Sequence, residues 1–318
     1  MSNSLPAAVD GILNLNKPMG TTSMDMVRWA KRLTRVRRVG HGGTLDPVAG
    51  GVLPICFGQA TRVMEYLISG SKVYRARVRM GVTTDTYDSL GKVTEEADPS
   101  QITREQVVEK LPSLTGTISQ QPPMYSALKR EGKRLYDLAR AGVEVERAPR
   151  QVKVHRLELV EWEPPFLTLE AECGRGVYMR SLAHDLGKAL GVGAHIHSLV
   201  RLRTGPFRLE DAVSPDEFAK AVEEGKWLSL LQPPDVILLG VASITVEARA
   251  ERLLRSGQPV PAGPDIMYAS HLERRRAYSP DGRFVGVVRL NKAQGIWQPE
   301  KVFQIAHPSM YSPRLAGR

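Results

Sequence analysis

Asp46 is the residue of this sequence best suited to carry out chemistry, because of the stretch that surrounds it. Val39 to Pro54 reads VGHGGTLDPVAGGVLP, where Asp46 and His41 are the only ionisable residues and five of sixteen positions are glycine. Glycine has no Cβ and adopts positive φ, so this backbone can approach a ligand closely. A carboxylate held in such a loop can act as a nucleophile or a general base.

Simpler interpretations of the same residues stay open at this level. An aspartate before a proline is a common turn residue that caps a backbone N–H. An isolated histidine such as His41 is more often structural than a ligand or a base. The glycines do not predict a nucleotide-binding loop, because neither G-x-x-x-x-G-K-[ST] nor G-x-G-x-x-G occurs.

The positive charge of the chain is concentrated around this stretch. Residues 1–80 contain 12 Lys and Arg against 4 Asp and Glu, so they carry +8 of the net +10. A run of like charge is usually a solvated surface. Its position beside the glycine-rich stretch favours contact with the phosphates of a nucleic acid. The run, which contains no acid, consists of Arg28, Lys31, Arg32, Arg35, Arg37 and Arg38.

A helix and a strand are expected to flank the loop. Thr22 and Asp25 form a capping box that begins the helix carrying most of the basic run. KVYRARVRM, at Lys72–Met80, alternates apolar and basic residues and predicts a half-buried strand. Tyr74 lies on its inward face, where it is either a core residue or the polar wall of a cleft.

Arg180 is expected to pair with a specific anion. The segment GRGVYMR ends at Arg180 and leads into a helix with an apolar stripe, which Gly191 terminates. Arg180 therefore lies in the first turn, where a cation opposes the helix dipole. Asp46 is a candidate for the compensating anion.

Other polar residues give weaker signals. His184, Asp185, His195 and His197 match no zinc spacing, so we predict no metal site. Asp85 and Asp88, in the loop TTDTYDSLG, are interpreted as turn residues, with a cation site as the alternative. Tyr125 and Tyr136 stand among basic residues, so base stacking and ordinary packing both remain open.

The length of 318 residues suits one large domain with a smaller appendage. We expect a flexible start (1–10), a catalytic domain (11–239), a linker at Gln232–Asp235, a small mainly-β domain (240–306) and a frayed tail (307–318). In the small domain we expect a helix at Val246–Ser256 and strands at Phe284–Leu290 and near Val302–Ile305.

The cysteine content and the absence of long apolar runs predict a soluble cytoplasmic protein. Cys56 and Cys173 are the only cysteines, and no secretory segment is recognisable. No apolar run approaches the roughly 20 residues that span a bilayer.

Seven motifs follow one another between residues 14 and 207: NLNKPMGTTS (14–23), GHGGTLDPVAGGVLP (40–54), KVYRARVRMG (72–81), TTDTYDSLG (83–91), PPMYSALKREGKRLYDLAR (122–140), GRGVYMRSLAHDLG (174–187) and GAHIHSLVRLRTGPF (193–207). In this order they resemble the TruB family of bacterial tRNA pseudouridine synthases, which modify uridine 55 in the T loop. The resemblance covers about residues 11–239.

The resemblance implies an α+β pseudouridine synthase fold, with a mixed, mainly antiparallel sheet flanked by helices and a small PUA-like C-terminal domain. It implies that Asp46 is the catalytic aspartate, that Tyr74 stacks on the target base, and that Arg180 pairs with the aspartate. It implies tRNA, through its T arm, as the partner of a monomer that needs no cofactor.

The resemblance also implies roles for residues around the pocket. His41 is similar to the histidine that supports the loop nucleotides after the target base has flipped out. Lys17 and Pro18 resemble the pair that buttresses the active-site tyrosine. Leu199 resembles the aliphatic wall, and Tyr178 and Arg201 resemble pocket supports.

The chemistry leaves two further questions open. Isomerisation breaks the glycosidic bond, turns the base and rejoins it through carbon 5, and Asp46 can serve by attacking the sugar, by attacking the base or by abstracting a sugar proton. A tRNA-folding chaperone is the alternative function. A phosphate-ester hydrolase fits less well, since the sequence has neither its metal ligands nor a phosphate loop.

Overall fold

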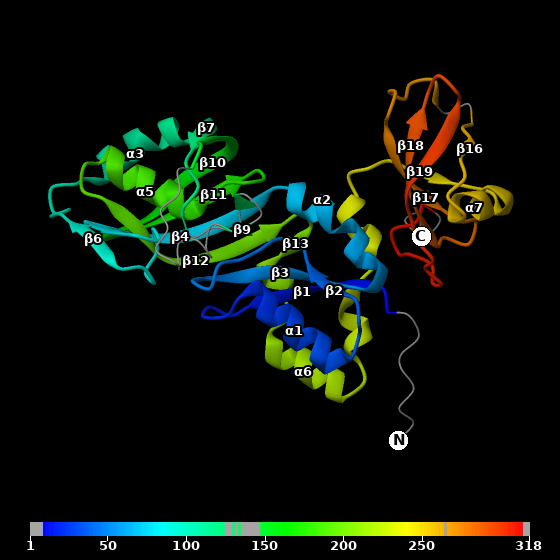
Figure 1. The fold of residues 1–318 in the computed structure, drawn as a ribbon, viewed down its shortest axis with the longest axis horizontal. Coiled ribbons are helices and arrows are strands. Elements are labelled where there is room, and N and C mark those ends of the chain that lie inside the picture. The colour runs from blue at the N-terminus through cyan, green and yellow to red at the C-terminus, as the bar shows by residue number, and fades with distance from the viewer. Residues whose placement is uncertain (1–8, 125–128, 131–132, 135–146, 264–265, 314–318) are drawn as a thin grey trace.

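The computed structural model describes residues 9–124, 129–130, 133–134, 147–263 and 266–313. Within them, a ten-stranded sheet runs through the larger part of the molecule (Figure 1). Its order is β14 (Leu231–Gln232), β1 (Gly11–Lys17), β3 (Ala49–Phe57), β12 (Ala194–Thr204), β4 (Lys72–Met80), β11 (Phe166–Cys173), β10 (Arg150–Glu163) and β7 (Gly116–Gln120). β2 (Val39–His41) pairs with β3, and β13 (Phe207–Arg208) pairs with β12. β12 and β3 are parallel, and the other neighbours are antiparallel, which confirms the mixed, mainly antiparallel sheet.

Helices cover one face of this sheet in two groups. α1 (Ser23–Thr34) and α6 (Pro215–Glu223) pack over β1 and β3, and both begin with a capping box. α5 (Met179–Ala189) and α3 (Arg104–Lys110) lie at the other end of the sheet (Figure 1). Both groups contribute to one apolar core. The stretch of sheet between the two groups carries the candidate site.

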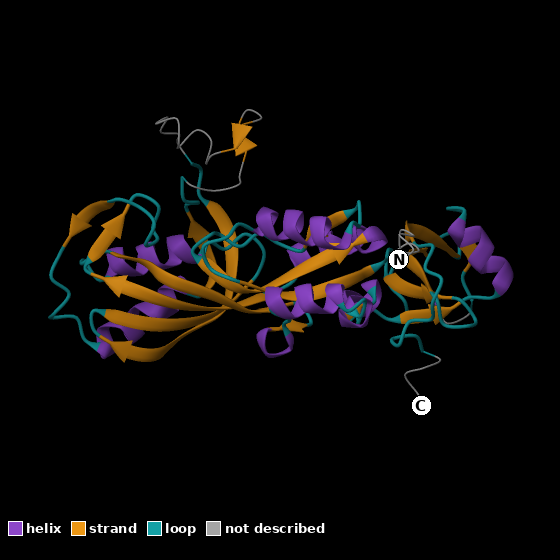
Figure 2. Cartoon of the chain, turned by 90° about the horizontal axis from the view of Figure 1, so that it is seen from below, coloured by secondary structure: helices purple, strands orange, loops and turns teal. Residues whose placement is uncertain are grey.

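A second sheet of five strands forms the C-terminal part, seen at the right of Figures 1 and 2. Its order is β15 (Ser243–Thr245), β17 (Arg274–Tyr278), β18 (Phe284–Asn291), β19 (Ile296–Val302) and β16 (Val260–Pro261), with α7 (Ala248–Arg255) beside it. This confirms a C-terminal β domain. The remaining elements are β5 (Val82–Thr84), β6 (Val93–Glu96), β8 (Lys129–Arg130), β9 (Lys133–Arg134), α2 (Met64–Ser69) and the 3-10 turns Gly58–Val63, Leu111–Leu114, Leu209–Asp211, Trp227–Leu230 and Pro234–Leu238.

Three expectations for the C-terminal half were wrong. The last strand is Ile296–Val302 rather than Val302–Ile305. The prediction missed it because Pro299 and its polar neighbours have low strand propensity. The stretch expected to be a linker enters a buried turn, in which Asp235 is fully buried. Residues 307–313 are not frayed, since Ser309 and Ser312 are buried.

The two sheets share a core. Ile12, Val52 and Cys56, on the face of β1 and β3 away from α1, cluster with Tyr278, Phe284 and Phe303 of the C-terminal part. Asp235 accepts hydrogen bonds from the Tyr278 hydroxyl and from Ser309 Oγ, each at 2.6 Å. The division at residue 240 stays a prediction, and a continuous apolar core crosses it.

Some predictions fall outside the described residues, namely those for 1–8, for Tyr125 and Tyr136 and for 314–318. Val9 and Asp10, expected to be flexible, are packed: Val9 is in the core, and Asp10 accepts hydrogen bonds from Gln59. No helix in the described part of the chain is long and apolar enough to cross a membrane.

Candidate active site

Arg180 joins two carboxylates at the centre of the site. Its Nη2 lies 2.9 Å from Asp46 Oδ2, so the ion pair expected from the helix position is present. Its Nη1 lies 3.4 Å from Asp88 Oδ2 and donates to the carbonyl oxygen of Thr86 at 3.1 Å. The Arg180 side chain is 4% exposed and the Asp46 side chain is 37% exposed. A buried cation thus holds one oxygen of a carboxylate that a substrate can still reach.

Asp88 is a site residue that sequence reasoning missed. Its Oδ1 accepts hydrogen bonds from Thr86 Oγ1 at 2.7 Å and from the Leu90 N–H at 3.1 Å, as a turn residue does. Its Oδ2 faces Arg180, and the side chain is buried. The sequence signalled only the turn, because the contact with Arg180 joins residues 92 positions apart.

A row of four residues crosses the sheet beneath Asp46. Lys17 of β1 is opposite Gly51 of β3, Gly51 is opposite Arg201 of β12, and Arg201 is opposite Tyr74 of β4. Residues opposite one another in a sheet project from the same face. Gly51 has φ +95°, and a Cβ there would lie 2.4 Å from the Arg201 carbonyl oxygen, so only glycine fits. The row therefore brings Lys17, Arg201 and Tyr74 together between the two helix groups.

Arg201 fastens the loop that carries Asp46. Its Nε donates to the Val52 carbonyl at 2.7 Å, Nη2 to Gly43 at 3.0 Å and Nη1 to Thr44 at 3.4 Å. The residue is 1% exposed. Carbonyls on both sides of Asp46 are thus tied to one strand of the sheet.

Ser23 fastens the same loop from α1, and sequence reasoning missed it too. Its Oγ accepts from the Leu45 N–H at 2.7 Å and donates to the Leu45 carbonyl at 3.0 Å. The backbone immediately before Asp46 is therefore fixed to the first residue of α1.

Lys17 is fully buried under the loop. Its Nζ donates to the carbonyls of Pro18 at 2.9 Å and Thr21 at 2.6 Å. Burial lowers the pKa of Lys17 to about 8, and the nearby charge of Asp46 acts in the opposite direction. Pro18 is exposed. The hydrogen bonds of Lys17 run to the turn 18–21, and the buttressing of Tyr74 stays a prediction.

His41 is half-buried at the end of β2, beside the loop. Its Nδ1 accepts a hydrogen bond from the Gly43 N–H at 3.3 Å, which leaves the ring proton on Nε2. Burial, together with the charge of Arg201, lowers the pKa of His41 below its usual range. The ring is therefore neutral at pH 7.

Tyr178 and Leu199 lie close in sequence to Arg180 and Arg201, on α5 and β12 respectively. Tyr178 is the N-cap residue of α5. The side-chain amide of Gln120 binds its backbone: the amide oxygen accepts from the Tyr178 N–H at 2.8 Å, and the amide nitrogen donates to the Tyr178 carbonyl at 3.1 Å. Gln120 is a further positioning residue that the sequence did not indicate. Leu199, 5% exposed, pairs with Ala49 and Ala76 in the sheet.

The six basic residues lie on the outside of α1 and the segment after it. All six are exposed: Arg28, Lys31, Arg32, Arg35, Arg37 and Arg38. Arg28 lies 3.2 Å from Asp25, in a pair open to solvent. The run therefore faces solvent beside the loop.

The three histidines among the four residues considered as a metal cluster make other contacts. His184 stacks on Tyr87, His195 Nδ1 lies 2.8 Å from the Val82 carbonyl, and His197 meets the edge of Phe166. Among the residues that the structure describes, no three His, Cys, Asp or Glu side chains are arranged to hold a metal ion.

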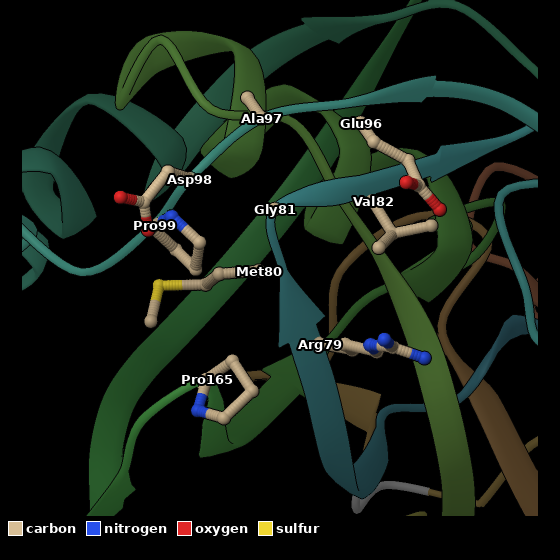
Figure 3. Close-up of a pocket in the computed structure, with 9 residues that line it drawn as sticks. All are labelled: Arg79, Met80, Gly81, Val82, Glu96, Ala97, Asp98, Pro99 and Pro165. Carbon is tan, nitrogen blue, oxygen red and sulfur yellow. The ribbon is translucent and has the colours of Figure 1, made fainter.

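A hollow of about 440 Å³ lies elsewhere, at the far end of β4 from Tyr74 (Figure 3). Its lining contains none of the candidate residues and consists of Arg79, Met80, Gly81, Val82, Glu96, Ala97, Asp98, Pro99 and Pro165.

Comparison with known proteins gives consistent matches. The TruB family pseudouridylate synthase N-terminal domain matches residues 31–179, and the tRNA pseudouridylate synthase B C-terminal domain matches residues 180–238. The tRNA pseudouridine synthase B of Symbiobacterium thermophilum is 49% identical over 78% of this chain and 82% of its own length. That of Dehalococcoides mccartyi is 41% identical over 93% of this chain and 97% of its own length. A crystal structure of a Cbf5-Nop10-Gar1 complex includes a chain with a TM-score of 0.70 and 26% identity, covering 95% of this chain and 86% of that one.

Proposed function

Because the chain belongs to the TruB family of pseudouridylate synthases, we propose that it isomerises uridine 55 in the T loop of tRNA, with Asp46 as the reacting carboxylate. The enzyme class follows from the family. The position modified and the roles of individual residues are the proposal. The observation that carries them is an accessible carboxylate paired with a buried arginine.

The reaction conserves atoms within the nucleotide. The bond from C1′ to N1 breaks, the base turns, and a bond from C1′ to C5 forms; C5 loses its hydrogen to solvent, and N1 gains one. Attack on the sugar, attack on the base and abstraction of a sugar proton each need one free carboxylate oxygen. Asp46 supplies it, since Arg180 contacts the other oxygen.

We propose for the neighbouring residues the roles that the family resemblance implies. Flipping a uridine out of folded RNA costs about a few kcal/mol. Phosphate contacts from the exposed basic run offset that cost. Tyr74 stacks on the detached base, Leu199 forms a wall, and His41 contacts the loop nucleotides through its Nε2–H. We further propose that the enzyme acts on the T arm as a monomer in the cytoplasm.

The test uses a T-arm stem-loop that carries tritium at carbon 5 of its uridines, incubated with the purified chain in EDTA. We expect release of tritium with no change in the mass of the RNA, because the new carbon–carbon bond displaces that hydrogen. Binding without release from either the stem-loop or full tRNA would leave the chaperone as the function. Shortened RNA would indicate a hydrolase.

Tyr74→Phe is expected to retain most of the turnover, and Tyr74→Leu to lose more. Tyr74 is half-buried and lies opposite Arg201 in the row. We assign its ring, rather than its hydroxyl, to contact with the base. Stacking of a base on an aromatic ring contributes about 1 to 3 kcal/mol. Single-turnover rates at saturating enzyme compare the two variants. Equal rates would show that stacking is not the role of Tyr74.

Binding of tRNA is expected to weaken steeply with salt. Lys31→Gln combined with Arg32→Gln should reduce the slope of log Kd against log salt by roughly one to two, because fewer counterions are released. The control combines Arg75→Gln with Arg156→Gln, which removes the same charge where both residues bind Glu170 on the other face of the sheet. An equal change of slope in the control would mean that net charge, not the basic run, sets the slope.

A further inference from the structure

The turn that supports Arg180 has an unusual backbone at Tyr87. This residue has φ +61°, in the left-handed region that non-glycine residues rarely occupy. It stands between Thr86, whose carbonyl accepts from Arg180, and Asp88, whose carboxylate faces the same Nη1. The left-handed backbone of Tyr87 therefore orients the Thr86 carbonyl and the Asp88 carboxylate, which both contact Arg180 Nη1, whereas Asp46 contacts Nη2.

The ring of Tyr87 stacks on His184. The ring centroids are 3.9 Å apart, and the planes are inclined by 13°. His184 follows Arg180 by one turn of α5, so the two side chains lie on the same side of the helix. α5 thus meets the turn twice, through Arg180 at Thr86 and Asp88 and through His184 at Tyr87.

The environment of His184 favours a neutral ring against the tyrosine. Burial, with Lys188 on the same helix and Arg147 nearby, lowers the pKa of His184, and Glu95 acts in the opposite direction. Its Nδ1 is buried and has no hydrogen-bond partner in the described part of the chain. The contact between His184 and Tyr87 is thus a stack of ring faces.

The backbone of the turn is attached independently of the Tyr87 ring. The Tyr87 carbonyl accepts from the Ile196 N–H at 3.0 Å, and its N–H donates to Thr84 at 3.2 Å. The first bond ties the turn to β12 and the second closes the turn, and neither involves the ring. The contribution of the ring is then to favour the local backbone conformation in which the Thr86 carbonyl and the Asp88 carboxylate face Arg180.

We propose that the stack of Tyr87 on His184 is a positioning device of the active site, which stabilises the left-handed turn and thereby fixes Arg180 against Asp46. The proposal rests on the proposed function, because Arg180 matters through Asp46. Neither residue touches the substrate; both act through the turn and the arginine.

The test is a series of variants with graded loss. Tyr87→Phe and His184→Phe keep a flat ring, Tyr87→Asn removes it but suits a left-handed backbone, and Tyr87→Ala loses both features. We expect kcat to fall by about tenfold in Tyr87→Ala and His184→Ala, less in Tyr87→Asn and little in the phenylalanine variants, with KM within about twofold throughout. His197→Ala is the matched control, since His197 contacts Phe166 away from Arg180.

A double-mutant cycle separates positioning from general destabilisation. In an Asp88→Asn background, Tyr87→Ala is expected to lower kcat by a smaller factor than it does in the wild-type background, because part of its route to the chemistry passes through that carboxylate. Additive losses, or a loss in His184→Phe equal to that in His184→Ala, would overturn the proposal.

Hydrogen exchange gives a readout that does not depend on turnover. The peptide spanning residues 84–91 is expected to exchange faster in His184→Ala than in wild type or His184→Phe. Unchanged exchange would contradict the device even if the wild-type chain releases no tritium. Faster exchange in a chain without turnover would leave the device standing and remove the proposed function instead.

Discussion

Asp46→Asn is expected to abolish isomerisation while leaving the affinity for tRNA within a few-fold of wild type. The amide keeps the shape of the carboxylate, and its oxygen can still face Arg180, whose Nη2 lies 2.9 Å from Asp46 Oδ2. It loses the negative charge and the nucleophilicity that every proposed route requires. Removing such a group typically lowers kcat by about 10⁴-fold or more. Tritium release measures the rate, and filter binding measures the affinity.

The control for this variant is Asp216→Asn, an exposed acid in the first turn of α6 that carries the same change of charge. It should release tritium at the wild-type rate. Turnover near wild type in Asp46→Asn would remove this carboxylate from the mechanism. A parallel loss of tRNA binding would mean that Asp46 holds the substrate rather than reacts with it.

Arg180→Lys is expected to lower kcat by about 10²- to 10³-fold, with a smaller change in KM. The guanidinium reaches Asp46 with one nitrogen and both Asp88 and Thr86 with the other. A single ammonium cannot reproduce this fork. Asp46 then loses its orientation, because one ammonium group cannot contact both acids. Single-turnover kinetics give the rate, and thermal unfolding shows whether the fold is retained.

The matched control is Arg203→Lys, because Arg203 pairs with Glu172 at 2.7 Å in the same sheet, opposite Val73 and therefore on the other face from Tyr74. It should behave as wild type.

Arg180→Met is expected to lower the stability of the fold as well as turnover, because it leaves the buried Asp88 carboxylate without its cation. Adding Asp88→Asn to Arg180→Met removes that buried charge, so it is expected to recover part of the lost stability but none of the lost turnover. Recovery of turnover in that pair would assign Arg180 a structural role only.

The parts of the site that rest on local signals were predictable from the sequence. The alternation in Lys72–Met80 predicted the whole of β4. The unfavourable place of Arg180 in the first turn of a helix pointed to Asp46, because a cation there needs an anion. Each of these signals lies within a few residues of the feature it predicts.

The parts that depend on tertiary contacts were not predictable. Asp88 and Ser23 look like ordinary turn and helix-start residues, and only the fold brings them to Arg180 and to Leu45. Asp235 sits in a proline-rich stretch that local composition assigns to a linker, yet the C-terminal sheet packs over it. The resemblance supplied the remaining pocket residues, whose roles stay proposals.

The core that joins the two sheets has a consequence for experiments on shortened chains. Ile12 and Val52 sit on the strands that carry Lys17 and Gly51 on their opposite face, and they are covered by Tyr278, Phe284 and Phe303. We therefore expect heat or urea to disrupt the larger sheet and the C-terminal sheet in one cooperative transition rather than two. A chain cut at residue 239 would leave that apolar surface open to water and prone to self-association. A loss of activity after such a cut would therefore first reflect aggregation, and only a soluble, folded fragment can show whether the C-terminal part contacts RNA.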